Sequence, residues 1–256
     1  MAKIFAITNQ KGGVGKTTTA INLAASLAAK KRKVLLIDAD PQGNATTGSG
    51  IDKNQIEFGL HHLLLKEQNL ENVILTTSHH YDLIPTNADL TAAEICLIQN
   101  SQAPTLLKEL LSPLQTHYDY IIVDCPPALN SLTLNTLVAA DKLIIPMQCE
   151  FFALEGLASL ISTMQQVQQH LNPKLNLLGI LRTMYDPRNR LALEVSRQIQ
   201  NYFPKQVFAV TIPKNIKLAE APSHGRPALS YAKYSAGAKA YMVLAEEVTA
   251  TEDMHA

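Results

Sequence analysis

Cysteine is scarce in this chain, and its spacing argues against two kinds of site. The 256 residues contain three cysteines, Cys96, Cys125 and Cys149, which is an odd number without a C-x-x-C pair. A disulfide framework and a zinc ribbon both require more cysteines at closer spacing. We therefore expect neither of them, and we expect the protein to work in a reducing compartment, the cytoplasm.

Long apolar runs and aromatic residues are also in short supply. No stretch approaches the roughly 18 uninterrupted apolar residues that a membrane span needs. The N-terminus has no charged region followed by an apolar run and a small-residue cleavage site, the pattern of an export signal. Aromatic residues make up 5% of the chain, too few for a ladder that stacks nucleic-acid bases. We expect a soluble protein that is not exported.

Hydrophobic residues are plentiful, at 46% of the chain, and this is enough for a sizeable core. Apolar runs bounded by turn residues alternate with segments of helical periodicity. The runs are Lys3–Thr8, Lys33–Asp38, Asp82–Pro85, Tyr120–Asp124, Lys142–Pro146, Leu175–Leu181 and Gln206–Val210. The alternation predicts an α/β fold with a mostly parallel sheet flanked by helices on both faces, in a single domain over residues 1–256. Residues 49–75 resist assignment and are expected to be a helical excursion.

A glycine-rich loop follows the first expected strand and leads into a helix expected from about Thr17 to Lys30. Glycines let backbone N–H groups turn toward a phosphate, and the helix N-terminus adds its dipole. In this pattern Lys16 reaches the outer phosphates of ATP and the Thr17 hydroxyl coordinates Mg²⁺. The residues expected to bind the nucleotide are Gly12, Gly13, Val14, Gly15, Lys16, Thr17 and Thr18. The sequence therefore predicts a P-loop NTPase.

The loop departs from the standard pattern in two places, because Gln10 replaces the first glycine and a second lysine, Lys11, follows it. Residues 11–18, Lys-Gly-Gly-Val-Gly-Lys-Thr-Thr, resemble the deviant Walker A motif of the ParA/MinD family. The resemblance implies that Lys11 reaches across an ATP-bound homodimer to the phosphates of the partner. There it would offset charge as the γ-phosphoryl group departs. The alternative is a solvent-exposed loop lysine.

Three aspartates lie at the carboxyl ends of two of the expected strands. Strand alternation points Asp38 and Asp40 to the same side, so one can enter the Mg²⁺ shell while the other orients the attacking water. The segment resembles the family's Walker A′ motif, which assigns the water to Asp40 and leaves Asp38 for the metal. Asp124 ends an apolar strand of Walker B form and is also expected in the Mg²⁺ shell. Paired acids at a strand end could instead cap a helix.

The neutral net charge conceals a basic block, since residues 171–240 hold 11 Lys and Arg against 3 Asp and Glu. Contacts between such side chains and DNA phosphates are independent of base sequence and sensitive to salt. The block contains Arg182, Arg188, Arg190, Arg197, Lys214, Lys217, Arg226 and Lys233. A solvated basic face is the simpler alternative.

The resemblance extends further, because residues 148–157 and 212–227 are similar to segments of small chromosomal ParA/Soj proteins. It implies an ATP-bound homodimer that coats duplex DNA, and a ParB/Spo0J-like centromere-binding partner that stimulates slow hydrolysis. It also implies association with the nucleoid, without a membrane partner. By the same resemblance, Pro213 and Asn215 lie near the adenine, and Arg188, Lys214 and Lys217 are expected to contact DNA.

Four other functions share parts of this pattern. A MinD-like membrane ATPase needs a C-terminal amphipathic helix with a basic face, whereas residues 246–256 are acidic. An iron–sulfur reductase needs cysteines to hold its cluster. A metabolite-activating enzyme and a DNA-coating scaffold with incidental hydrolysis complete the alternatives.

Because the first expected strand begins at residue 3, no N-terminal helix-turn-helix domain is expected.

Overall fold

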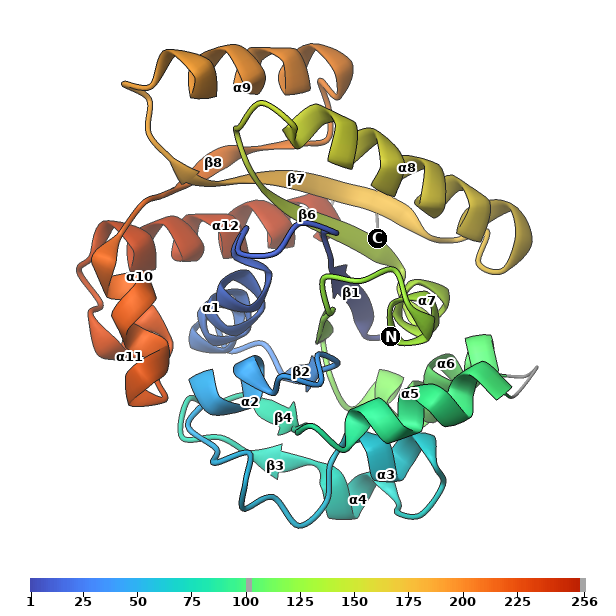
Figure 1. The fold of residues 1–256 in the computed structure, drawn as a ribbon. Helices are drawn as coiled ribbons and strands as arrows, with labels where there is room; N and C mark the ends of the chain where they lie inside the picture. Colours follow the sequence, from blue (N-terminus) through green and yellow to red (C-terminus); the bar gives the residue numbers. More distant parts are fainter. Residues whose placement is uncertain (100–102, 254–256) are drawn as a thin grey trace.

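An eight-stranded sheet forms the centre of the computed structural model, which describes residues 1–99 and 103–253. The spatial order of the strands is β3-β4-β2-β5-β1-β6-β7-β8, and all neighbours are parallel except β3 and β4 (Figure 1). The bounds are β1 Lys3–Ile7, β2 Val34–Asp38, β3 Leu75–Thr76, β4 Asp82–Ile84, β5 Tyr120–Asp124, β6 Lys142–Gln148, β7 Asn176–Tyr185 and β8 Val207–Pro213. The prediction of a mostly parallel α/β sheet is confirmed.

Helices cover both faces of the sheet, as predicted. One face carries α1, α10, α11 and α12, and the other carries α3 and α5 to α9 (Figure 1). Among the described residues the α-helices are α1 Lys16–Ala29, α2 Asn44–Gly48, α3 Leu60–Leu64, α4 Leu70–Val73, α5 Leu90–Gln99, α6 Leu106–Leu111, α7 Ser131–Ala139, α8 Ala153–His170, α9 Arg190–Tyr202, α10 Ile216–Glu220, α11 Ala228–Tyr231 and α12 Ala236–Asp253.

Strand alternation explains why both faces are covered. In β1, Ile4 and Ala6 join the core under one layer of helices, while Phe5 and Ile7 join the core under the other. All four side chains are buried. A strand with apolar side chains on both faces is stable only between two layers, and this accounts for the nearly continuous apolar runs in the sequence.

The segment from residue 49 to residue 75 is only partly helical. It contains the two short helices α3 and α4 and then enters β3, a two-residue edge strand antiparallel to β4. The sequence expectation included no strand here. A strand of two residues has no alternation to reveal it, and its pairing depends on β4 rather than on local pattern.

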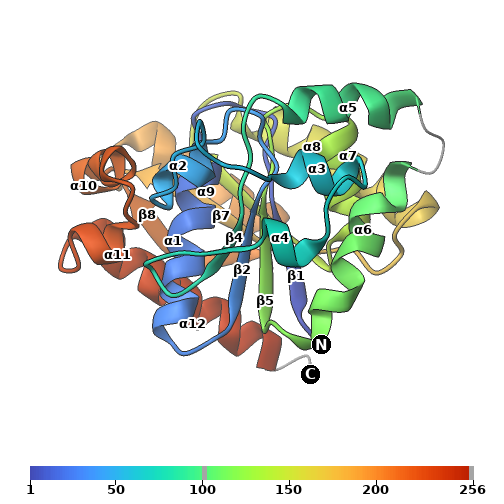
Figure 2. The same ribbon diagram turned by 90° about the horizontal axis from the view of Figure 1, so that it is seen from below.

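The register of the central strands brings the expected site residues together. Asp124 at the end of β5 is paired with Ile7 of β1 and with Asp38 of β2. All three strands end at the same edge of the sheet, which faces upward in Figure 2. Within the described residues, no helix is long and apolar enough to cross a membrane.

Candidate nucleotide-binding site

The phosphate loop connects β1 to α1 and depends on glycine. Gly13 and Gly15 have φ values of 73° and 90°, in the left-handed region that favours residues without a Cβ. A Cβ built at Gly12 or Gly13 would meet nothing within 4 Å, so open space lies over the loop. For residues 13–18, the described part of the chain offers no hydrogen-bond acceptor to the backbone N–H groups. Such a row of free donors at a helix N-terminus fits an anion.

Two neighbouring strands hold the loop in this shape. The Thr183 hydroxyl of β7 donates to the Val14 carbonyl at 2.7 Å, and the Gln148 side-chain amide of β6 donates to the Gly13 carbonyl at 3.1 Å. Because both contacts use loop carbonyls, the N–H groups stay directed to the open side. Neither residue was expected from the sequence, since each lies more than a hundred positions from the loop.

Lys16 begins α1 and is buried, with 7% of its surface exposed. Burial lowers the pKa of its ammonium group, and the charges of Asp124 and Asp40 oppose that shift. The Nζ atom donates to the Lys11 carbonyl at 3.3 Å. An ammonium group held among carboxylates at the end of an open phosphate loop is placed to bind an outer phosphate.

Asp124 is fully buried, and neither of its carboxylate oxygens has a hydrogen-bond partner within the described residues. Burial raises the pKa of this carboxyl well above its usual range, and the Asp38 charge adds to the shift; the Thr17 hydroxyl lies close enough to oppose it, although its geometry is not that of a full hydrogen bond. Unpaired buried oxygens are costly in water-free surroundings, and a cation would relieve that cost. Oxygen donors of this kind suit Mg²⁺.

Asp38 is also buried, but its carboxylate has partners. Its Oδ2 atom accepts from the backbone N–H and the hydroxyl of Thr46, both at 2.7 Å, and its Oδ1 atom accepts from the Asp40 N–H at 3.3 Å. Burial raises the pKa of Asp38 to about 7. Thr46 lies in the first turn of α2, whose N-cap is Gly43, so Asp38 satisfies one backbone N–H of that turn from outside the helix.

Asp40 lies two residues beyond β2, at the same edge as Asp124 and close enough to influence the charge of Lys16. It is 8% exposed, and its Oδ1 atom accepts from the Gln42 N–H at 3.0 Å. Within the described residues, no group of three or more His, Cys, Asp or Glu side chains could hold a metal ion. A magnesium ion at this edge would therefore need other oxygens, such as the Thr17 hydroxyl and nucleotide phosphates.

Lys11 is directed away from the buried group formed by Lys16 and Asp124. Its ammonium forms an ion pair with Glu150, which follows β6, and about half of each side chain is exposed. The next two residues, Phe151 and Phe152, are exposed aromatic side chains with ring centroids 5.1 Å apart. The Lys11–Glu150 ion pair and the exposed pair of phenylalanines thus lie next to each other beside the phosphate loop.

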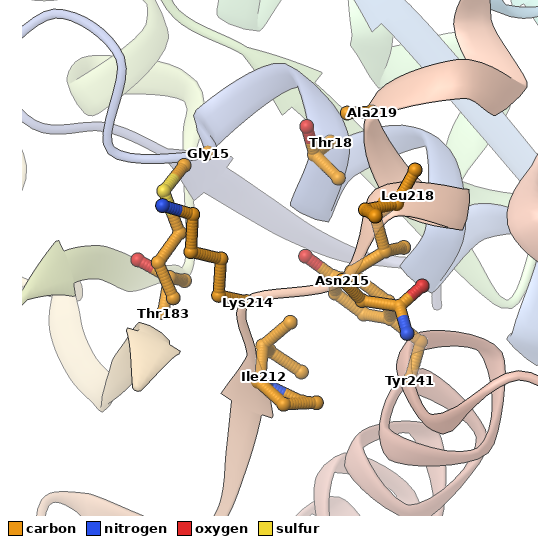
Figure 3. Close-up of a pocket in the computed structure, with 12 residues that line it drawn as sticks. Gly15, Thr18, Thr183, Ile212, Lys214, Asn215, Leu218, Ala219 and Tyr241 are labelled. Atoms are coloured by element: carbon orange, nitrogen blue, oxygen red, sulfur yellow. The ribbon is translucent and has the colours of Figure 1, made fainter. Parts of the chain in front are cut away.

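An apolar cavity of about 310 Å³ opens next to the phosphate loop (Figure 3). Gly15 and Thr18 form the wall shared with the loop. Pro213, the last residue of β8, and Asn215, two residues later, form part of another wall. The sequence did not predict the other lining residues, which come from β7, β8, α10 and α12. They include Thr183, Met184, Ile212, Ile216, Leu218 and Tyr241. Pro213 and Asn215, which were predicted to lie near the adenine, both line this cavity.

The basic block is divided by burial. Arg182 is 6% exposed, and its guanidinium donates to the Ser196 hydroxyl and to the Phe208 and Ala209 carbonyls. This member of the basic block is therefore not available at the surface, because β7 is covered on both faces at this position. Charge content alone does not reveal which cations are buried.

The three residues favoured for DNA contact are exposed but differ in their partners. Arg188 forms a bidentate ion pair with Asp186 at 2.8–2.9 Å, and Lys217 pairs with Glu220 at 2.8 Å. The Arg188 side chain holds the pKa of Asp186 down, at about 2. Lys214 lines the apolar cavity and extends toward Gly15 (Figure 3). It is thus close to both the nucleotide site and the surface.

Comparisons with known proteins agree with this geometry. A family model described as an AAA domain matches residues 2–177. The chain is 47% identical to the sporulation initiation inhibitor protein Soj of Bacillus subtilis, over 98% of this chain and 99% of that protein. It is 47% identical to the chromosome partitioning protein ParA of Myxococcus xanthus, over 97% of this chain and 88% of that protein.

A solved structure gives the same result at the level of fold. Cobyrinic acid a,c-diamide synthase from Mycobacterium smegmatis, with bound ADP and magnesium, superposes with a TM-score of 0.84 and 36% identity. The match covers 96% of this chain and 93% of that one. The identities and coverage, together with the phosphate loop, show that this chain belongs to the family of the ParA and Soj chromosome-partitioning proteins.

Proposed function

We propose that this protein is a DNA-partitioning ATPase, which converts ATP to ADP and phosphate and uses the ATP-bound state to hold DNA. One observation carries the proposal: a phosphate loop with free N–H donors adjoins both an apolar cavity and a buried carboxylate without partners. A base, a chain of phosphates and a divalent cation each find a matching surface within one continuous site.

In this proposal each part of the nucleotide has its own set of residues. The adenine enters the apolar cavity beside Pro213 and Asn215. The phosphates lie against the backbone from Gly12 to Thr18, and the Lys16 ammonium binds the outer phosphates. The glycine conformations and the contacts from β6 and β7 organise this surface before the nucleotide arrives, which lowers the cost of binding.

Mg²⁺ would be held by oxygens of Thr17, Asp38 and Asp124. When bound, it would neutralise charge on the transferred phosphoryl group. Asp40 would orient the attacking water, because it lies at the same edge and its carboxylate is close to Lys16. The unpartnered oxygens of Asp124 are the strongest support for the ion, whereas Asp38 must share its carboxylate with α2.

Completion of the site would require a second copy of the chain. To reach the phosphates of a partner, Lys11 must leave Glu150, and the exposed Phe151 and Phe152 supply apolar surface for the contact between copies. The ATP-bound homodimer would thus assemble the catalytic lysine only after association. This requirement accounts for slow turnover without a further partner.

The output of this cycle would be DNA binding without sequence preference. Arg188, Lys214 and Lys217 are exposed near the carboxyl ends of β7 and β8, and a dimer presents each of them twice to one duplex. A ParB/Spo0J-like partner would stimulate hydrolysis and release the DNA. The protein would therefore act in the cytoplasm at the nucleoid.

The experiment that tests the proposal compares the parent chain with Lys16→Ala and Asp40→Ala by sedimentation and duplex binding, with and without ATP. Lys16→Ala should lose the ATP-dependent dimer, and Asp40→Ala should remain as a DNA-bound dimer because it does not hydrolyse ATP. Lys108→Ala, an exposed lysine on α6, is the matched control. Binding of DNA that is indifferent to ATP in the parent would contradict the proposal.

Two alternative functions can be tested with the same purified protein. A MinD-like membrane ATPase would sediment with anionic vesicles in the presence of ATP, but the last described part of α12 carries acidic rather than basic charge. A metabolite-activating enzyme would release phosphate only with a small-molecule acceptor; the Mycobacterium smegmatis neighbour is named as a synthase of a small molecule. Phosphate release stimulated by DNA without such an acceptor favours partitioning.

A further inference from the structure

A second cavity lies at the opposite edge of the sheet from the phosphate loop. Its volume is about 500 Å³, and it forms where the amino ends of β4, β2 and β5 meet. In Figure 2 this is the lower edge of the sheet. Three turns contribute its polar lining, which consists of Lys31, Arg32, Lys33, His80, Asp82 and His117. The nucleotide site uses none of these residues.

The cations of this cavity have no partners of opposite charge. Within the described residues, Lys31, Arg32 and Lys33 form no ion pair. Asp82, the acidic residue in the lining, already accepts from the Thr76 hydroxyl at 2.9 Å and from the Tyr118 hydroxyl at 2.8 Å. The lining thus holds three cations against one carboxylate, and the Asp119 carboxylate, which accepts from the Lys33 N–H at 2.7 Å, adjoins it.

Lys30 precedes these residues in sequence and provides a contrast. Its ammonium pairs with Glu246 of α12 at 2.8 Å, and it does not line the cavity. Four consecutive basic residues are thus divided, one stabilising the contact between α1 and α12 and three facing the cavity. A general preference for cations at the C-terminal end of a helix explains Lys30. It does not explain why the side chains of residues 31–33 line the cavity.

Lys31 also occupies a position that favours glycine. Its φ is 64°, and the Lys31 and Arg32 N–H groups donate to the Ala28 and Leu27 carbonyls, the pattern that ends a helix with a left-handed residue. His80, on the facing turn, has a φ of 66°. Two lining positions therefore carry ionisable side chains where the backbone alone would favour glycine.

We propose that this cavity binds a small anion that contains linked phosphates. Three cations from consecutive residues and the two histidines opposite them surround a space that fits a short phosphate chain. A planar guanidinium at Arg32 can bind two phosphoryl oxygens, while the lysines act as point charges. The concave shape favours a small ligand over a DNA duplex, whose backbone needs an open basic face.

Titration calorimetry with inorganic tripolyphosphate tests the proposal. The background is Lys16→Ala, which weakens binding at the phosphate loop; any binding that remains there is common to the two variants compared, Arg32→Gln and Lys30→Gln. Arg32→Gln should weaken binding about tenfold or more, because a charged hydrogen bond to the ligand is lost. Lys30→Gln removes one positive charge two residues before Arg32. Its tripolyphosphate affinity should stay within about twofold of the background, because Lys30 does not face the cavity.

Further measurements keep the result independent of folding. Lys31→Gly should weaken binding while leaving the melting temperature unchanged or higher, since glycine suits its backbone. In the parent protein saturated with ADP, tripolyphosphate should shift the ring resonances of His80 and His117. Three outcomes would each overturn the proposal. They are no binding at millimolar tripolyphosphate, an equal loss of tripolyphosphate affinity in Lys30→Gln and Arg32→Gln, and an Arg32→Gln variant that changes only the affinity for duplex DNA.

Discussion

The cations of the phosphate loop and those of the proposed DNA face differ in burial and in their ion pairs. Lys16 is buried near Asp124, and open space lies over the loop that it follows. Arg188 is exposed, and its guanidinium is paired with Asp186 of the same turn. A buried, organised charge can select one ligand geometry, whereas exposed charges with exchangeable partners suit a long, repetitive polyanion.

This contrast also orders the expected effects of substitution. At the buried site there is little screening, and loss of one group leaves others without partners. On the surface each ion pair is screened by water and salt, so single changes have small effects that depend on ionic strength.

The largest effect is expected from Lys16→Ala. Removal of the ammonium should lower ATP affinity by about 100-fold, because a charged hydrogen bond to phosphate contributes up to about 3 kcal/mol. Calorimetric titration with ATP and Mg²⁺ measures it. Lys108→Ala should bind ATP as the parent does. Comparable ATP affinities for the parent, Lys16→Ala and Lys108→Ala would show that Lys16 does not bind the phosphates.

Lys11→Ala should separate binding from turnover. The loop lysine is paired with Glu150 rather than directed to the phosphate loop of its own chain, so ATP affinity of the monomer should change by less than about twofold. Hydrolysis by the dimer should fall by about 100-fold or more, as with other cations that stabilise phosphoryl transfer in trans. Single-turnover phosphate release measures the rate. A large loss of monomer affinity would place Lys11 in its own site instead.

Arg188→Glu and Asp186→Asn form a matched pair on the surface. The first should weaken duplex binding several-fold at low salt, and the second should strengthen it, because Arg188 would be released from its internal partner. Fluorescence anisotropy with a labelled duplex over a salt series measures both. Equal affinity of Arg188→Glu and the parent at low salt would remove Arg188 from the DNA face. ATP affinity serves as the control and should not change.

The smallest effect concerns the pH dependence of the same pair. The pKa of Asp186 is lowered from 3.8 to about 2 by Arg188, so the folded protein keeps this carboxylate ionised where the unfolded chain begins to protonate it. Its stabilising contribution is present above pH 4 and is lost as the pH falls toward 2. NMR titration of the carboxyl should show the lowered pKa in the parent and a return toward the ordinary value in Arg188→Ala.

Much of the fold could be predicted because it is encoded locally. The bounds of β5 match the predicted run, β1 and β2 differ from their predictions by one residue at one end, and α1 differs by one residue at each end. Apolar runs and glycine positions are local signals, and the backbone must respond to them wherever the segment lies. The two-residue β3 has no such signal and was missed.

The candidate site divides in the same way. The loop glycines and Lys16 follow from local sequence, and the register of β2 and β5 brings Asp38 and Asp124 side by side. The contact of Thr183 with Val14 and the pairing of Lys11 with Glu150 span more than a hundred residues. Such contacts depend on which strands become neighbours, and no single segment carries that information.

The sequence by itself determined the chemistry of this protein: a loop that binds phosphates, the aspartates that accompany it and a basic block. The tertiary structure decided where that chemistry is available. It buried Arg182, placed an apolar cavity beside Gly15 and brought His80 and His117 to the consecutive cations of residues 31–33 at the far edge of the sheet. The reason is physical, because residue type sets which interactions a side chain can make, whereas packing sets its neighbours and its distance from water.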